Sequence, residues 1–225
     1  MAEMQLAGAD SRRAMWVPQS WLRAESLAGL AELNEQCLEL LCEQACAAAV
    51  GRPRPALIAQ LEPLWRGLDA LARRRAAHCP FLLLDAGLAR PGSLAWPEES
   101  RVCDQDFRAG AFFTVARTVP VTRLVLAYAW HLVRSEGAAA RLFLGVSSAC
   151  AARLAACTLR QVMQLAENDP RLLKPRWPHR IQVWRELLGA AAGADPFALE
   201  QARMRGLQLL AAEARASELA CARTL

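Results

Sequence analysis

Residues 121–177 decide the fold of this chain, and they read VTRLVLAYAWHLVRSEGAAARLFLGVSSACAARLAACTLRQVMQLAENDPRLLKPRW. Val121, Val125, Tyr128 and Leu132 are spaced four, three and four residues apart, which places them on one face of a helix. A serine and a glycine interrupt the pattern shortly afterwards. The stretch therefore opens with an amphipathic helix.

Signals that begin and end helices divide the remainder of this stretch. Gly145 is a good terminator for the short helix before it. Ser147 is a favourable N-cap for a helix through Ala156. Residues 158–161 have the form of a capping box, in which a threonine hydroxyl caps the backbone and a glutamine side chain reaches back. We expect this box to start a helix that residues 168–170 stop, because they contain Asn, Asp and Pro.

Helical patterns also cover most of the chain outside this stretch. A helix over residues 55–75 is expected to be kinked or split at Pro63. The apolar run 80–88 is either a buried strand or a helix segment, because periodicity does not decide for so short a run. The other predicted helices span residues 20–50, about 105–118, 178–193 and 195–219.

Composition supports an all-α, multi-helix array of seven to nine helices. Hydrophobic residues make up 54% of the 225 residues, and Ala, Leu, Arg and Glu, which favour helix, dominate. A loop at 89–100 suggests a boundary between an N-terminal helical region, 1–100, and a second region, 101–225. We see neither a signal peptide nor an apolar run of about 18 residues, so we expect a cytoplasmic protein with no membrane contact.

Charge is distributed unevenly along the chain. Residues 1–115 hold 12 arginines and 14 acidic residues, whereas residues 116–225 hold 15 basic and 8 acidic residues, so the net charges are −2 and +7. An anionic partner for the second region is one interpretation, since arginine neutralises phosphates and reads guanine edges. The alternative is a solvated helical surface with Trp177 and Trp184 in the core. The candidate DNA-binding residues are Arg153, Arg160, Arg171, Lys174, Arg176 and Arg180.

No pattern argues for an enzyme, a cofactor or a bound metal. Cys42 and Cys46 share a helix face, but no second ligand pair accompanies them, so we interpret them as free thiols. An enzyme would require a pocket that gathers Asp85, His78 and Cys79. The eight cysteines suit a reducing compartment better than a disulfide framework.

From about residue 124 to 177 the chain resembles FlhD, the flagellar master transcriptional regulator. The resemblance rests on a helix, LAYAWHLVRSE, an alanine-rich turn into a Leu-Gly pair, AAARLFLGV, and then a capped helix and the start TLRQVMQLAEN. The order of these pieces matches without gaps over about a quarter of the chain. The first 115 residues have no counterpart in FlhD.

The resemblance implies an all-helical homodimer that binds a zinc-containing partner, FlhC, and activates transcription from flagellar promoters. The positions that it links to partner engagement are Glu136, Leu142, Phe143 and Asp169. The family has a Phe-Arg pair where this chain has Leu142-Phe143, and its inter-subunit cysteine falls on Leu173. The expected function is therefore an FlhD-like regulator at promoter DNA, acting as a dimer with a protein partner that is FlhC-like or another regulator. The alternative is a helical protein–protein adaptor that keeps the fold without binding DNA.

Overall fold

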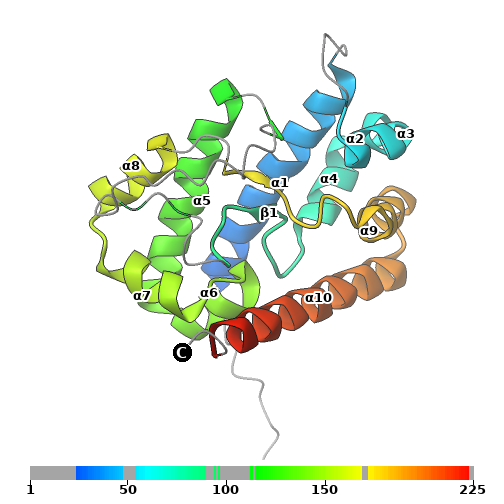
Figure 1. Ribbon diagram of the computed structural model, residues 1–225. Coiled ribbons are helices and arrows are strands. Elements are labelled where there is room, and N and C mark those ends of the chain that lie inside the picture. Colours follow the sequence, from blue (N-terminus) through cyan, green and yellow to red (C-terminus); the bar gives the residue numbers. More distant parts are fainter. Residues whose placement is uncertain are drawn as a thin grey trace, which may run out of the picture.

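The computed structural model describes residues 24–47, 54–89, 94, 96, 112–113, 115–168 and 172–222. Within these residues the chain forms ten helices and one two-stranded sheet, which confirms the predicted all-α, multi-helix array (Figure 1). In chain order the elements are α1 (Ala24–Cys46), α2 (Ala56–Gln60), α3 (Glu62–Gly67), α4 (Ala70–Ala77), β1 (Leu84–Asp85), α5 (Val115–Ser135), α6 (Gly137–Leu144), α7 (Ser148–Ala156), α8 (Leu159–Asn168), β2 (Lys174–Pro175), α9 (Ile181–Gly193) and α10 (Pro196–Ala222).

The predicted helix over 55–75 forms three separate helices, α2, α3 and α4. The number of helices in the described residues therefore exceeds the expected seven to nine. The first break lies at Leu61, directly before α3. Pro63 lies in the first turn of α3, where a missing N–H has no helical partner to lose. The second break lies before Asp69, whose carboxylate caps α4 by accepting a hydrogen bond from Ala72 N at 2.6 Å.

The predicted break between residues 118 and 121 was wrong, because α5 continues through Pro120. A proline inside a helix removes one backbone hydrogen bond, and the burial of Val121, Val125 and Leu132 on the same face offsets that loss. This burial confirms the helix face predicted from their spacing. Tyr128 is partly buried, and its hydroxyl donates to the carbonyl of Ser26 in α1.

The caps inside the decisive stretch form as predicted. Gly145 ends α6 in the left-handed conformation, with φ +66°. Ser147 Oγ accepts a hydrogen bond from Cys150 N at 3.3 Å and caps α7. Thr158 and Gln161 exchange both bonds of a capping box, because Gln161 N donates to Thr158 Oγ1 at 3.3 Å and Thr158 N donates to Gln161 Oε1 at 2.8 Å.

The apolar run 80–88 is an extended, buried segment. Its strand β1 pairs antiparallel with β2, with Leu84 opposite Pro175. The side chain of Asn34 in α1 fixes the backbone that leads into it. Its Nδ2 donates to Phe81 O at 2.9 Å, and its Oδ1 accepts from Leu83 N at 2.8 Å. One buried amide therefore positions this segment against α1.

Both predicted regions contribute to the hydrophobic core. In Figure 1, β1 lies near the middle of the molecule, α1 and α5 run beside each other, and α10 extends along one edge. Trp65 of α3 packs on Trp184 of α9 with ring centroids 5.7 Å apart. Trp177 and Trp184 are both buried, as expected if the basic residues around them form a solvated helical surface. The proposed boundary near residue 100 lies outside the described residues.

None of the described helices combines the length and the apolar character that a membrane crossing requires.

Candidate functional site

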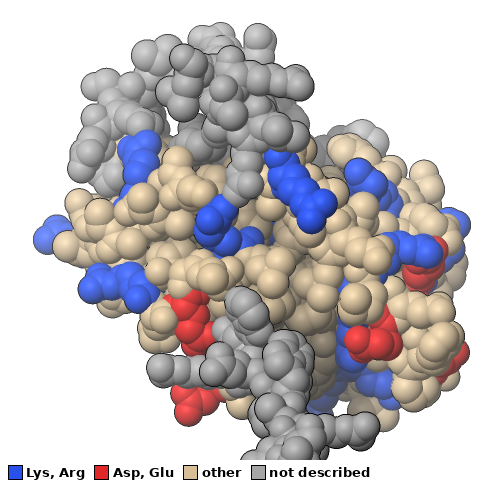
Figure 2. All heavy atoms as spheres, turned by 90° about the horizontal axis from the view of Figure 1, so that it is seen from below, with Lys and Arg blue, Asp and Glu red and all other residues tan. Residues whose placement is uncertain are grey.

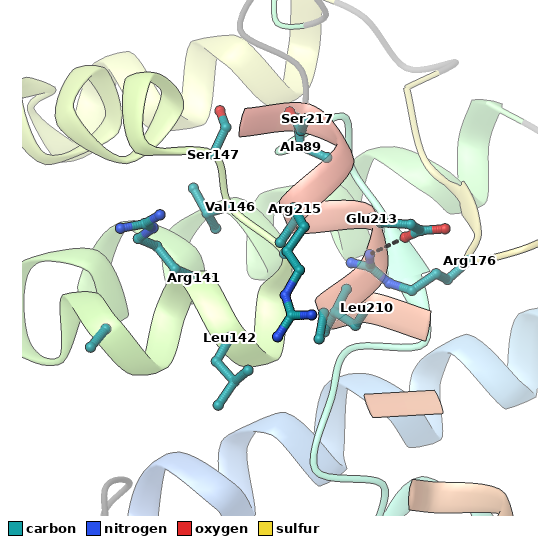
Figure 3. A pocket seen from close by; sticks show the side chains of 14 residues that line it. Ala89, Arg141, Leu142, Val146, Ser147, Arg176, Leu210, Glu213, Arg215 and Ser217 are labelled. Carbon is teal, nitrogen blue, oxygen red and sulfur yellow. Dashed lines mark hydrogen bonds and ion pairs between the residues drawn. The ribbon is translucent and has the colours of Figure 1, made fainter. Parts of the chain in front are cut away.

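A hollow of about 320 Å³ lies between α6 and α10. The loop that follows α6 closes one side of it. Its apolar lining includes Leu142, Val146 and Leu210, and the charged residues at its edge include Arg141 and Arg215 (Figure 3). Val146 and Leu210 are buried, whereas Leu142 is 47% exposed. At this hollow an exposed leucine of α6 therefore adjoins buried apolar residues.

Arg176 supports this hollow from inside and is 5% exposed. Its Nε donates to Leu82 O at 2.9 Å, and its Nη2 donates to Leu144 O at 2.8 Å. The same Nη2 lies 3.3 Å from Leu84 O. A buried guanidinium is stable only when its donors have partners. Here backbone carbonyls from two distant segments accept from Nε and Nη2, and Nη1 faces Glu213. Arg176 therefore joins the end of α6 to the buried strand β1.

The electrostatics around Arg176 match its burial. Burial lowers the pKa of its guanidinium, while the charges of Asp85 and Glu213 act in the opposite direction. Glu213 of α10 lies 3.9 Å from Arg176 Nη1 and accepts a hydrogen bond from Trp177 Nε1 at 2.6 Å. The carboxylate of Glu213 is thus directed toward the core side of the hollow.

Gly145 allows the loop to approach α10 closely. Besides requiring φ +66°, a Cβ at this position would lie 2.9 Å from Leu210 Cδ1 and 3.0 Å from Arg176 Nη1. An L side chain would therefore be strained in its backbone and crowded by two neighbours. Gly145, in its left-handed conformation, therefore lets the loop between α6 and α7 pack directly against Leu210 and Arg176.

The candidate DNA-binding residues are not gathered into one site by any contact among the described residues. Lys174 Nζ lies 3.4 Å from Asp85 Oδ2, and the guanidinium of Arg153 lies 4.2 Å from the centre of the Trp96 ring. Arg160 in α8 and Arg180 before α9 are exposed. Arg171 lies outside the described residues.

Arg176 is a correction to that set of candidates. Its side chain is buried and its donors are bonded to backbone carbonyls, so it does not reach a phosphate. The sequence pattern grouped it with exposed arginines because charge alone does not reveal burial. Seen from below, Lys and Arg side chains of the described residues are spread over the face and form no single patch (Figure 2).

The candidate partner-binding residues have different environments. Leu142 projects at the hollow, whereas the neighbouring Phe143 is partly buried and packs against the core. Phe143 also accepts a backbone hydrogen bond from Leu82 N at 3.0 Å. Glu136 Oε1 accepts from Ser26 Oγ at 2.9 Å, which ties it to α1. Asp169 lies outside the described residues.

Cys79, Asp85 and His78, the residues considered for enzyme chemistry, each have a different environment. Cys79 is buried, and desolvation raises its pKa to about 12 although the charge of Arg203 lowers it. Asp85 accepts from Gly87 N at 2.9 Å besides its ion pair with Lys174. His78 is exposed at the end of α4. Over the described part of the chain, no three His, Cys, Asp or Glu side chains gather as metal ligands would.

Sequence reasoning missed Arg141, Val146, Leu210 and Arg215 as parts of one surface. Arg141 and Val146 belong to α6 and the loop after it, whereas Leu210 and Arg215 belong to α10. The two segments that meet at the hollow are thus about 70 residues apart in the chain. Helical spacing on α10 indicates which residues share a face, but not which helix that face meets. No protein-family model, no characterised protein and no solved structure matches this chain.

Proposed function

We propose that this protein is a cytoplasmic, non-enzymatic transcription regulator that resembles FlhD and acts as a dimer with a protein partner at promoter DNA. The observation that carries the proposal is the exposure of Leu142. Its side chain is 47% exposed on α6, and α6 belongs to the stretch whose order of helices resembles FlhD. We assign Leu142 as the anchor for a partner because its exposed side chain lines the hollow between α6 and α10. The proposal assigns this surface to the partner.

The proposal gives most of the DNA contact to the partner. This division is supported by the surroundings of the candidate cations, since Arg176 is buried and Lys174 is paired with Asp85. Arg160 and Arg180 are exposed but belong to different elements. Two separate arginines supply less phosphate neutralisation than a continuous basic surface.

The test is chromatin immunoprecipitation of the tagged full-length protein in its native host. We expect promoter enrichment for the wild type and its loss in Leu142→Asp, because a charge at the anchor prevents docking. The matched control is Leu71→Asp, an exposed leucine of α4 outside the FlhD-like stretch, which should keep the enrichment. Absence of promoter enrichment for the wild type would refute the regulator proposal. Light scattering of the purified protein tests the dimer, and a monomeric mass contradicts that part.

The helical adaptor is the second candidate function, and it is favoured by the spread of cations in Figure 2. An adaptor binds its partner through the same surface but does not associate with promoters. Co-purification of a partner that Leu142→Asp abolishes, together with no promoter enrichment, would establish the adaptor in place of the regulator.

A further inference from the structure

The hairpin of α9 and α10 presents an exposed phenylalanine at its corner. Ala194 and Asp195 are the two residues between these helices, and Ala194 turns the chain sharply with φ +52°. The carboxylate of Asp195 accepts hydrogen bonds from Phe197 N at 2.9 Å and from Ala198 N at 3.1 Å. Phe197 is 72% exposed. Its backbone is therefore fixed by a helix cap while its ring lies in solvent.

A second hollow, of about 460 Å³, opens between the same two helices. We call it the hairpin hollow, and its lining residues are Arg185, Glu186, Gly189, Ala190, Ala198, Gln201, Ala202 and Arg205. A Cβ added at Gly189 would meet nothing within 4 Å, so the space above α9 is open there. An apolar cavity of roughly 150 Å³ holds a benzene ring, so the hairpin hollow has room for an aromatic side chain.

The phenylalanine and the hairpin hollow lie on neighbouring parts of one surface. Gln201, which lines the hollow, follows Phe197 by four residues, about 6 Å along the helix axis. Phe197 does not fill the hollow of its own chain, because most of its side chain is exposed. A projecting group beside a matching hollow is the arrangement that a twofold interface requires, since each copy uses the same patch.

We propose that Phe197 inserts into the hairpin hollow of a second copy of this chain, and that the second copy returns the same contact. The inference rests on the proposed function, because it specifies the surface through which the proposed dimer forms. The twofold axis crosses α10 between Phe197 and the hollow, so the two α10 helices run antiparallel. The helix cap that fixes Phe197 reduces the ordering cost of this contact.

The charges on the two parts of this surface are complementary. Two ion pairs within the chain join Glu186 to Arg205 and Glu200 to Arg203. Arg185, at the end of the hollow away from the corner, donates to Gln182 Oε1 at 3.1 Å and has no acidic partner among the described residues. In the antiparallel pair this end meets the acidic corner of the other copy. Arg185 therefore faces Asp195 of the partner subunit.

The expected contact is small and leaves the other end of α10 free. Two phenylalanines bury roughly 150–250 Å² each, and with the surfaces they cover the total approaches about 1,000 Å², the low end of specific interfaces. The dimer is therefore concentration-dependent. The hollow beside α6 is lined by α10 residues from Leu210 onward, so Leu142 stays available to a different protein partner (Figure 1).

The test measures the mass of the full-length protein by light scattering from about 1 to 100 µM. We expect the wild type to dimerise across this range. The dissociation constant should rise at least about tenfold for Phe197→Asp, which removes the projecting ring, and for Gly189→Leu, which fills the hollow. Leu71→Asp and Gly67→Leu are matched controls with changes of less than about twofold, because Leu71 is exposed on α4 and a Cβ at Gly67 meets nothing within 4 Å.

Mixing the two variants tests the reciprocal contact. Phe197→Asp keeps an open hollow, and Gly189→Leu keeps its phenylalanine, so a mixed dimer restores one of the two contacts. The equimolar mixture should associate more tightly than either variant alone. Circular dichroism of each variant checks that the fold is retained. A mixture that associates no better than its components contradicts the insertion of Phe197 into the hollow.

Two further results would overturn this inference. One is a wild type that stays monomeric up to about 100 µM, and the other is a dimer whose dissociation constant is the same in Phe197→Asp and Gly189→Leu. Promoter enrichment together with either result refutes this interface and leaves the regulator function standing. A dimer that both variants weaken, without promoter enrichment, refutes only the regulator function. Loss of promoter enrichment by Phe197→Asp in a monomeric protein assigns the ring to a different occupant.

Discussion

Arg176 is a buried cation whose role is to connect separate parts of the backbone. Its side chain bonds Leu82 O and Leu144 O, and its own N–H donates to Leu83 O at 2.7 Å. The carbonyls at the end of a short helix, or beside a strand of two residues, find few backbone N–H donors within helices and sheets. The guanidinium supplies several donors in one plane and satisfies them together.

Replacing Arg176 with methionine should lower the free energy of unfolding by about 3 kcal/mol, because it leaves buried carbonyls unpaired. Urea unfolding followed by circular dichroism measures this change. Arg180→Met is the control, since Arg180 is exposed and its loss should change stability by less than about 0.5 kcal/mol. Equal stability of the two variants would contradict the structural role assigned to Arg176.

The two arginines also show the limit of sequence reasoning at single residues. Arg176 lies at the end of the stretch 121–177, and Arg180 lies four positions after Arg176. The sequence assigned both to a basic surface. Only the approach of the segment 82–84 explains why one is buried and the other exposed, and that approach is a long-range contact.

At the scale of single elements, the helix boundaries depend on local caps. The capping box of Thr158 and Gln161 satisfies two backbone donors at the start of α8. Thr158→Ala should destabilise the protein by about 1 kcal/mol, measured by urea unfolding. Thr158→Ser keeps the hydroxyl and should retain most of the stability. A Thr158→Ala variant as stable as the serine variant would show that the box contributes little.

Close packing between α10 and the segment before β1 gives a second prediction at this scale. A Cβ at Gly206 would lie 2.1 Å from Cζ of the buried Phe81 ring. Gly206→Ala should therefore lower stability by about 2 kcal/mol, because the ring has to move within a packed core. At Gly189 in α9 a Cβ meets nothing within 4 Å, so Gly189→Ala should raise stability by about 0.5–1 kcal/mol. Thermal unfolding compares the two variants, and a stabilising Gly206→Ala would contradict the packing described.

At the scale of the whole molecule, buried thiols link stability to pH. Burial raises the pKa of Cys79 and of Cys150 to about 12, from an ordinary value of 9.0. Below pH 9 both thiols are protonated in the folded and the unfolded chain, so their contribution to stability is complete. Above pH 9 the unfolded chain releases these protons first, and stability falls until the pH reaches about 12.

We therefore expect the free energy of unfolding to decrease by about 2 kcal/mol from these two thiols between pH 9 and pH 10. Urea unfolding under reducing conditions at several pH values measures the slope. The double variant Cys79→Ala/Cys150→Ala should show a shallower pH dependence, whatever its stability at neutral pH. An unchanged slope would exclude these thiols as its source.

The sequence by itself determined the helical class, the end of α6 and the boundaries of α7 and α8. These features depend on interactions within about four residues: a glycine in the left-handed conformation, a serine cap and a capping box. It also indicated that residues 80–88 are buried. It did not predict the continuation of α5 through Pro120, because there packing outweighs local preference. It predicted a kink or split of the helix over 55–75 at Pro63, and the chain breaks directly before α3, but the second break before α4 was not predicted.

The tertiary structure alone decided which charged and apolar side chains form a surface. It buried Arg176, left Leu142 exposed, and brought Arg215 of α10 to the hollow beside α6. These outcomes depend on contacts between segments about 30 to 90 residues apart, for which the chain carries no local signal. The helices follow from nearest neighbours, whereas the candidate site follows from how α6, α10 and the buried strand β1 pack together.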